Sequence, residues 1–349
     1  MRTDRYIDLL RHLIEIPSVS GQEKDAADYL EGWLAGEGLA PHRLLNNVWL
    51  ESEPAGTKPT LMLNAHIDTV KPAASYTRNP FGASLEGDIL YGLGSNDDGG
   101  SLVALLAAFS ELASRPQPYR LVWSATAQEE NSGRLGLEAI LPRIGEIALA
   151  VVGEPTGMRM AVAERGLMVL DCTACGKSGH AARDEGDNAI YRAMRDMEWF
   201  RTYQFEKVSP YLGRTKMSVT MVSAGSQHNV IPDRCDFVVD IRPNGICSNQ
   251  EILDTVRSNV SSTVVPRSML HSGFCIDENS PVVVRGRSMG LEAYGSPTSS
   301  NGTLLSCPTL KIGPGESSRS HSADEFILIP EIVSGTEIYI RLLDGLQLV

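Results

Sequence analysis

The sequence predicts an α/β protein whose main domain has a mainly parallel sheet with helices on both faces. It also predicts an inserted, ferredoxin-like α+β domain. In the first part of the chain, short apolar runs alternate with segments of helical spacing, which is typical of parallel α/β sheets. After about Ala163 the order changes to β-α-β-β-α, and from about Cys275 the first pattern returns. The expected domains are therefore 1–163 and 275–349, interrupted by an insert over 164–274.

Local sequence patterns predict each helix and strand of the main domain. Apolar residues at helical spacing predict helices over Tyr6–Glu15, which ends before Pro17, and over Glu23–Gly36. Strands buried on both faces appear as short apolar runs rather than as alternating patterns. In chain order these runs are 48–51, 60–64, 119–127, 147–153 and 309–315. The remaining helices are expected at 101–114, 137–141 and 331–343.

The insert is read in the same way. Alternation in VLDCTAC (169–175) predicts a strand that places Cys172 and Cys175 on opposite faces, so packing is favoured over a zinc or redox C-x-x-C site. A helix over 188–205, strands over 216–222 and 235–243, a helix over 251–259 and a last strand near Ser268–Phe274 complete the pattern.

Composition excludes several classes of protein. The 349 residues allow about two domains. The net charge of −12 argues against nucleic acid or an anionic membrane as partner. There is no apolar run of the ~20 residues that a membrane span needs, and the N-terminal sequence shows no secretory signal. Six cysteines are too few for a disulfide scaffold, so we expect a cytoplasmic enzyme.

Polar residues follow nearly every predicted strand of the main domain, where sites of open α/β sheets form. Alone, each has an ordinary interpretation: a structural histidine, a solvated Glu-Glu pair, a turn acid or a helix N-terminal aspartate. Their recurrence at equivalent strand ends favours a metal site, and mixed imidazole and carboxylate donors suit zinc, cobalt or manganese. The residues are His66, Asp68, Asp97, Asp98, Glu129, Glu130, Glu154 and His321.

These residues lie in motifs that resemble those of the M20 metallopeptidase and deacylase family. The motifs are IPSVSGQE, HIDTV, GLGSNDDGG, AQEENSG, VGEPT and HSADEF, in this order along essentially the whole chain. The resemblance implies two divalent metal ions, with zinc expected and cobalt or manganese as alternatives.

The resemblance assigns a role to each matched residue. It implies that His66 and Glu154 bind one metal and that Glu130 and His321 bind the other, with Asp97 bridging both. Asp68 would orient the imidazole of His66. Glu129 would act as general base on the metal-bridging water.

In the insert, the resemblance implies a lid and dimerisation domain. His180 in GKSGHAAR would reach the active site of the partner subunit of a homodimer and stabilise the oxyanion. Asn229 and Arg242 would bind the substrate near its carboxylate, where the planar guanidinium can form two parallel bonds. Two departures stand out. Asn301 occupies a position where related sequences have an acid, and Asp98 follows Asp97 where many have a basic residue; we expect Asp98 not to be a ligand.

Other functions fit the sequence less well. In a dinucleotide-binding reading of the Gly92 turn, Asp97 would occupy the third glycine position and repel a pyrophosphate. A serine hydrolase would need a G-x-S-x-G elbow, which is missing. A binding protein that has lost catalysis is a remote alternative, because every matched ligand and the base are present.

The segments 163–183 and 313–326 look most like acetylornithine deacetylase-like proteins. We therefore expect deacetylation of N-acetylornithine in arginine biosynthesis. Succinyl-diaminopimelate desuccinylase and an M20 dipeptidase or carboxypeptidase are the alternatives.

Overall fold

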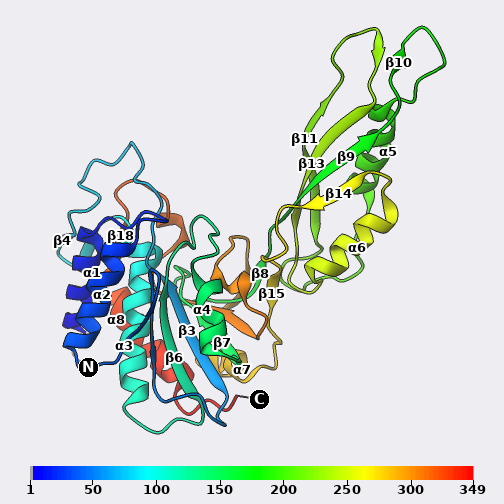
Figure 1. Ribbon diagram of the computed structural model, residues 1–349. Coiled ribbons are helices and arrows are strands. Elements are labelled where there is room, and N and C mark those ends of the chain that lie inside the picture. Colours follow the sequence, from blue (N-terminus) through cyan, green and yellow to red (C-terminus); the bar gives the residue numbers. More distant parts are fainter. Residues whose placement is uncertain (1–2, 349) are drawn as a thin grey trace. The chain divides into compact units, whose positions relative to one another are not determined.

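A sheet with a parallel centre forms the middle of the first of two structural units. The computed structural model describes residues 3–348. Unit 1 extends to Val162 and includes Ile276–Tyr294 and the segment from Ser300 onward, whereas unit 2 comprises Ala163–Cys275 and Gly295–Ser299. The chain leaves unit 1 within strand β8 (Met160–Arg165) and returns after β15 (Gly273–Cys275), which pairs with the end of β8 (Figure 1).

The sheet of unit 1 has parallel strands at its centre and antiparallel strands at its sides. Strands β6, β3, β7 and β17 are parallel neighbours, while β2 pairs with β6, and β8 with β17, in the antiparallel sense. The prediction of a mainly parallel central sheet is confirmed. In spatial order the strands are β1 (His42–Leu44), β2 (Asn47–Glu51), β6 (Arg120–Thr126), β3 (Thr60–His66), β7 (Leu149–Val152), β17 (Thr309–Lys311) and β8, which also pairs with β16 (Ala293–Ser296).

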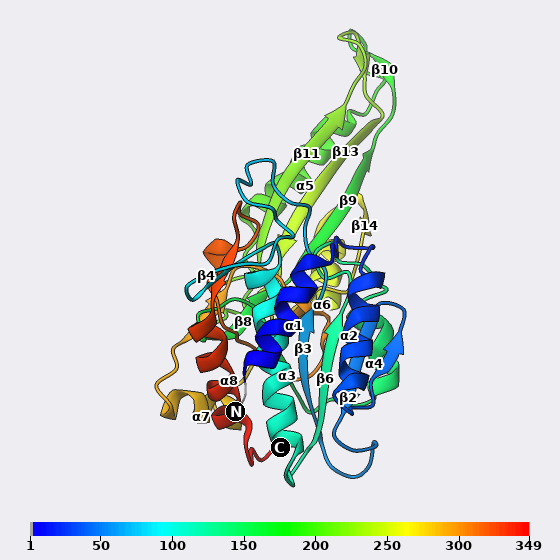
Figure 2. The same cartoon turned by 90° about the vertical axis from the view of Figure 1, so that its left-hand side faces the viewer.

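Helices cover both faces of this sheet, as the sequence predicts. Met62 and Val122 pack with Ile140 of α4 (Leu137–Ile144) on one face. Because side chains alternate along a strand, Leu61 and Leu63 point to the opposite face, where α3 packs on β3 and β6 (Figures 1 and 2). The other helices of unit 1 are α1 (Asp4–Glu15), α2 (Lys24–Gly36), α7 (Pro281–Ser288) and α8 (Ile329–Leu343), with α3 spanning Gly100–Ala113.

A small sheet joins two segments that are far apart in the sequence. Strand β18 (Phe326–Leu328) pairs with β5 (Ile89–Tyr91), which pairs with β4 (Ser84–Glu86). The short turn η1 (Ser95–Gly99) follows β5, and the turn η3 (Ser317–Arg319) precedes β18. This pairing brings the chain around Asp97 next to the chain around His321.

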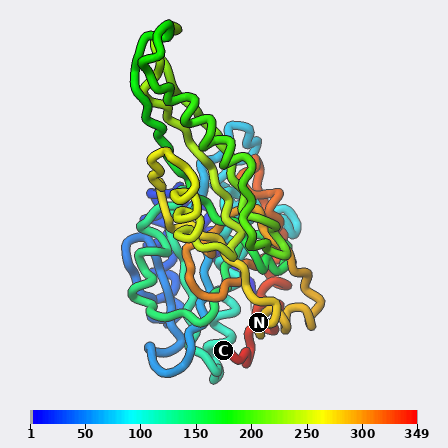
Figure 3. The backbone as a smooth tube through the Cα atoms, turned by 90° about the vertical axis from the view of Figure 1, so that its right-hand side faces the viewer, coloured from blue at the N-terminus to red at the C-terminus, as the bar shows by residue number. Residues whose placement is uncertain are grey.

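Unit 2 has the ferredoxin-like order β-α-β-β-α-β. Its antiparallel sheet runs β11-β13-β9-β14, and α5 and α6 cover one face (Figures 1 and 3). The core between them includes Leu170, Phe200, Phe237 and Ile252. The elements are β9 (Met168–Cys175), α5 (Ala189–Thr202), β11 (Lys216–Ala224), β13 (Arg234–Arg242), α6 (Asn249–Asn259) and β14 (Thr263–Pro266); β10 (Gly179–His180) pairs with β12 (Val230–Ile231).

Of two predictions for this unit, one is wrong and one is confirmed. The last strand of its sheet is β14, not the segment Ser268–Phe274, whose end instead forms β15 beside β8. Strand β14 has only four residues and ends at Pro266, so its pairing with β9 leaves little periodic signal in the sequence. Cys172 is buried and Cys175 exposed, as the alternation predicts.

Within residues 3–348, no helix is both long and apolar enough to cross a membrane.

Candidate metal centre

The candidate site of unit 1 forms where parallel strands end at one edge of the sheet. His66 is the last residue of β3, Glu129 and Glu130 follow the neighbouring strand β6, and Glu154 follows β7 on the other side. Asp97 comes from η1, and His321 from the loop between β17 and β18. The carboxyl ends of parallel neighbours lie together, which explains why distant motifs converge here.

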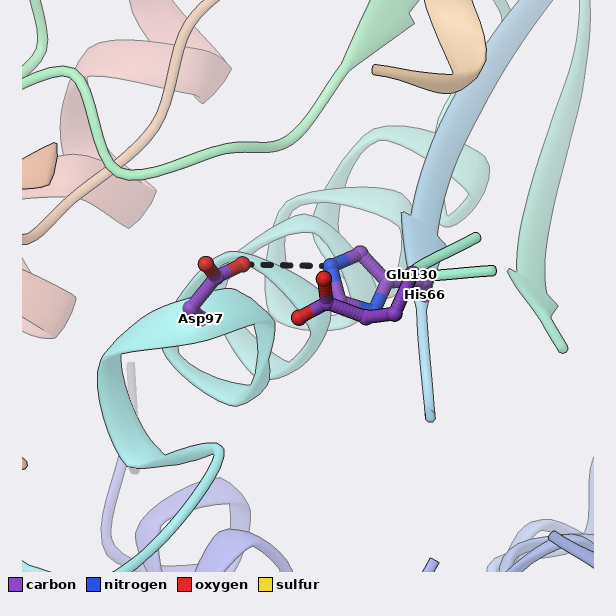
Figure 4. A group of neighbouring side chains, drawn as sticks. All are labelled: His66, Asp97 and Glu130. Atoms are coloured by element: carbon purple, nitrogen blue, oxygen red, sulfur yellow. Dashed lines mark hydrogen bonds and ion pairs between the residues drawn. The ribbon is translucent and has the colours of Figure 1, made fainter. Parts of the chain in front are cut away.

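Asp97 lies between two imidazoles. Its Oδ1 is 3.2 Å from Nε2 of His66, and its Oδ2 is 3.6 Å from Nε2 of His321. The same nitrogen of His321 lies 3.0 Å from the carboxylate of Glu130. Figure 4 shows His66, Asp97 and Glu130 directed toward one another. A carboxylate that presents one oxygen to each of two histidines has the geometry of a bridging ligand.

The potential ligand atoms form two overlapping groups. One contains His66, Asp97 and Glu130, and the other contains His66, Glu129 and Glu154; within each group the atoms lie within 4.8 Å of one another. Imidazole nitrogens and carboxylate oxygens are donors that divalent zinc, cobalt and manganese accept. These groups contain four of the five residues for which the sequence implies metal binding, together with Glu129, and His321 lies beside Asp97 and Glu130.

Burial shifts the pKa values of the carboxyl groups in this cluster. Burial raises the pKa of Glu129 to about 8, and neighbouring carboxylates, first that of Glu130, add to the shift. Burial also raises the pKa of Glu154 well above its usual range, although Lys311 opposes the shift. Burial acts on Asp97 in the same sense, but His66 and His321 more than offset it and lower its pKa. A buried group of four carboxylates is costly without compensating positive charge, which divalent metal ions would provide.

Asp68 contacts both His66 and the loop that carries Glu129 and Glu130. Its carboxylate accepts hydrogen bonds from the backbone N–H groups of Glu129 (3.0 Å) and Glu130 (3.1 Å) and from the hydroxyl of Ser20 (2.6 Å). Nδ1 of His66 lies 2.9 Å from the backbone carbonyl oxygen of Asp68 and 3.5 Å from its carboxylate. Asp68 therefore contacts both the imidazole and the loop of Glu129. Sequence reasoning gave Ser20 no role, although it lies in the first motif.

Both departures from the family pattern are buried. Oδ2 of Asp98 accepts the backbone N–H of His66 (3.3 Å), and Oδ1 has no hydrogen-bond partner among the described residues. Asp98 belongs to neither group of potential ligands found in residues 3–348. Asn301 donates to Asn64 (3.1 Å) and to Thr126 (3.0 Å) below the strand ends, so its amide completes an internal polar network.

The residues predicted in the insert lie in unit 2. His180 is exposed in β10, and its Nδ1 accepts the backbone N–H of Ala182 (3.1 Å). Asn229 is exposed just before β12. Arg242 ends β13, and its guanidinium makes two hydrogen bonds to the carboxylate of Asp240 (2.8 and 3.0 Å).

Comparison with known proteins agrees with this geometry. The family model described as peptidase family M20/M25/M40 matches residues 62–345. A protein of Cereibacter sphaeroides named succinyl-diaminopimelate desuccinylase is 26% identical, with 97% of each chain covered. A protein of Pyrobaculum aerophilum is 28% identical, with 93% of each chain covered; its name gives hydrolysis of LysW-lysine and LysW-ornithine as a provisional function.

Solved structures share the fold. Aminopeptidase PepT of Bacillus cereus has a TM-score of 0.72 and 16% identity, with 98% of each chain covered. A Bacillus subtilis protein described as a dinuclear metal-binding peptidase of family M20 has a TM-score of 0.68 and 15% identity, with 98% of this chain and 97% of that chain covered. At these identities the likeness extends to the fold alone.

Proposed function

The chain belongs to peptidase family M20/M25/M40, and on this premise we propose that it hydrolyses the amide bond of an N-acyl amino acid with the help of two divalent metal ions. The observation that carries the proposal is the position of Asp97 between His66 and His321. His66 and Glu154 would hold one ion, Glu130 and His321 the other, and Asp97 both. Zinc suits these donors, and cobalt or manganese would also fit.

The chemistry needs a base beside the metals. Two divalent ions would polarise the scissile carbonyl and lower the pKa of a water molecule. Glu129 takes a proton from the attacking water and gives it to the leaving amine nitrogen as the C–N bond breaks and the new C–O bond forms. Metal ions beside Glu129 would favour its ionised form, which is the form that accepts a proton from water.

The substrate class follows from what the relatives share. Diaminopimelate, lysine and ornithine, which appear in the names of the relatives, are all diamino acids. We propose that the substrate is an N-acyl derivative of such an amino acid. N-succinyl-diaminopimelate is the candidate that the relatives' names favour. N-acetylornithine remains the second candidate, supported by the segments 163–183 and 313–326 and by ornithine in the name of one relative.

We further propose that unit 2 carries the substrate-binding residues and the dimer interface. Within the described residues, β11 is an edge strand of its sheet, and Met221 and Val222 are 63% and 56% exposed on it. An exposed apolar edge strand can pair with a second copy of the chain. The partner would then supply His180 to the oxyanion, while Arg242 and Asn229 would bind the carboxylate end of the substrate.

Glu129→Gln tests the assignment of the base. The replacement keeps the size of the side chain but cannot accept the proton, so kcat should fall about 10²–10⁴-fold. Metal content, measured by elemental analysis, should stay near two equivalents. Equal loss of metal and turnover would show that Glu129 is a ligand instead.

A mixed dimer tests the role of the partner subunit. His180→Ala and Glu129→Gln subunits, each inactive alone, should regain turnover when combined, because one active site then receives an intact Glu129 and an intact His180. Heterodimers without recovered turnover would exclude this arrangement.

A further inference from the structure

Glu325 is a buried carboxylate that binds the backbone of the segment around Asp97. Its side chain accepts three N–H groups, from Gly94 (3.0 Å), Asn96 (2.9 Å) and Asp97 (2.9 Å). Only 2% of the residue is exposed. Glu325 therefore holds the turn that presents Asp97 from the side of the loop that presents His321.

Asn96 forms the reciprocal connection. Its amide nitrogen donates to the carbonyl of Glu316 (3.1 Å) and the hydroxyl of Ser320 (3.3 Å), and its Oδ1 accepts the N–H of Glu316 (3.0 Å). Gly315 makes room for this amide, since a Cβ there would lie 2.3 Å from Oδ1 of Asn96. Glu325 therefore binds the turn of Asp97 from the loop of His321, and Asn96 binds that loop from the turn.

These contacts lie close in the sequence to the two candidate ligands. Asn96 directly precedes Asp97, Ser320 directly precedes His321, and Glu325 lies four residues after His321. The side chain of His321 is 55% exposed, so packing around it fixes its position only in part. The pairing of β18 with β5 brings its loop beside the turn of Asp97, and the side chains of Glu325 and Asn96 add direct hydrogen bonds between the two segments.

We propose that Glu325 and Asn96 are positioning residues that set the separation between the Asp97 carboxylate and the His321 imidazole, and so control metal binding at the Glu130–His321 position. The inference rests on the proposed function only in taking these residues as ligands. The other metal position shares Asp97 but has two ligands, His66 and Glu154, that this link does not hold. His66 and Glu154 stand at the ends of β3 and β7, and the imidazole of His66 is already fixed by the carbonyl of Asp68.

Stepwise metal titration tests the proposal without any substrate. The metal-free protein is titrated with Co²⁺, followed by its visible absorption, and with Zn²⁺ by calorimetry. Glu325→Gln keeps the size and shape of the side chain but turns an amide NH₂ group toward at least one backbone N–H. Asn96→Ala removes the hydrogen bonds from the Asn96 amide to Glu316 and Ser320. Each should weaken the second binding step about 10–100-fold. The first step, which uses His66 and Glu154 besides Asp97, should change less than the second.

Asp324→Asn is the matched control. Asp324 also accepts backbone N–H groups, those of Thr77 and Arg78 (both 2.9 Å), but that segment carries no candidate ligand. Asparagine tolerates the positive φ of 54° at this position. The control should bind both metals like the wild type. Circular dichroism of each variant checks that it folds, and if Glu325→Gln does not fold, Asn96→Ala decides alone.

The outcomes separate this proposal from the proposed reaction. Loss of the second step in the two variants, with both steps intact in the control, supports the positioning role even if the wild type hydrolyses none of the substrates tested. Two wild-type-like steps in a folded Glu325→Gln or Asn96→Ala variant would overturn it. A wild-type protein that binds only one metal would also overturn it, whatever its turnover.

Discussion

Replacement of Asp68 by asparagine tests how the site is held together. The carboxylate accepts hydrogen bonds through both oxygens, from Glu129, Glu130 and Ser20. An asparagine has one acceptor oxygen and an NH₂ group of the same size. In either orientation the NH₂ group faces one of the two backbone N–H groups, so at least one of these donors loses its partner.

The size of the effect follows from that count. A buried donor left unsatisfied costs about 1–3 kcal/mol. We therefore expect the free energy of unfolding of the metal-free protein to fall by about that amount. The displaced loop carries both the base and a ligand, so we expect kcat or metal affinity to fall about 10–100-fold, as is typical for residues that support metal ligands.

Urea unfolding, metal titration and steady-state kinetics measure the three quantities. Ser20→Ala is the matched control, because it removes one hydrogen bond to the same carboxylate and leaves both backbone contacts. It should cost only about 0.5–1.5 kcal/mol of stability. An Asp68→Asn protein with wild-type stability, metal affinity and kcat would refute the reasoning that Asp68 holds the loop of Glu129.

Three further predictions follow from the site. Removal of metal with EDTA should lower Tm by roughly 4 °C for each site, since metal at 100 times its Kd adds about 2.7 kcal/mol and the unfolding entropy of 349 residues is about 0.7 kcal/mol per degree; an unchanged melting curve by calorimetry would mean that no metal stabilises the fold. The metal-free protein should lose stability between pH 5 and pH 8. Burial raises the pKa of Glu129 to about 8 and that of Asp98 to about 7 from ordinary values of 4.5 and 3.8, so the folded state binds more protons than the unfolded chain in this range. Urea unfolding across this range checks the sign, and stability that rises with pH would contradict it. Asn301→Ala should cost about 1–3 kcal/mol in urea unfolding, because it leaves the buried Oδ1 of Asn64 without its donor, yet metal content should not change.

The sequence predicts where His66, Glu130 and Glu154 meet because these residues stand at or just after the ends of apolar strands. The run at 60–64 marks β3, which continues to His66, and 147–153 marks β7 before Glu154. Parallel pairing then forces these ends together, whereas Asp97 and His321 meet through the long-range pairing of β5 with β18. The same reasoning cannot identify Glu325 or Asn96 as supports, because their bonds to backbone N–H groups of a distant segment leave no periodic pattern.

Local patterns also explain the errors in the fold. Helix α6 begins at Asn249 rather than Glu251, because Ser248 and Glu251 form a capping box that extends its first turn. Helix α7 was not predicted, since its sequence PVVVRGRS contains three β-branched valines and a glycine, which favour other conformations. In each case a tertiary or capping contact decides what local propensity leaves open.

Metal-dependent amine release tests the central claim most directly. The zinc- or cobalt-loaded protein and an EDTA-treated control are assayed with N-succinyl-diaminopimelate, N-acetylornithine, N-acetylcitrulline, N-acetylmethionine and several dipeptides. The account predicts turnover of an N-acyl diamino acid that is lost with EDTA and restored by metal, and the preferred acyl group decides between the two candidates. Turnover of dipeptides alone would keep the metal site but contradict the proposed substrate class. Turnover that persists without metal would contradict the account itself.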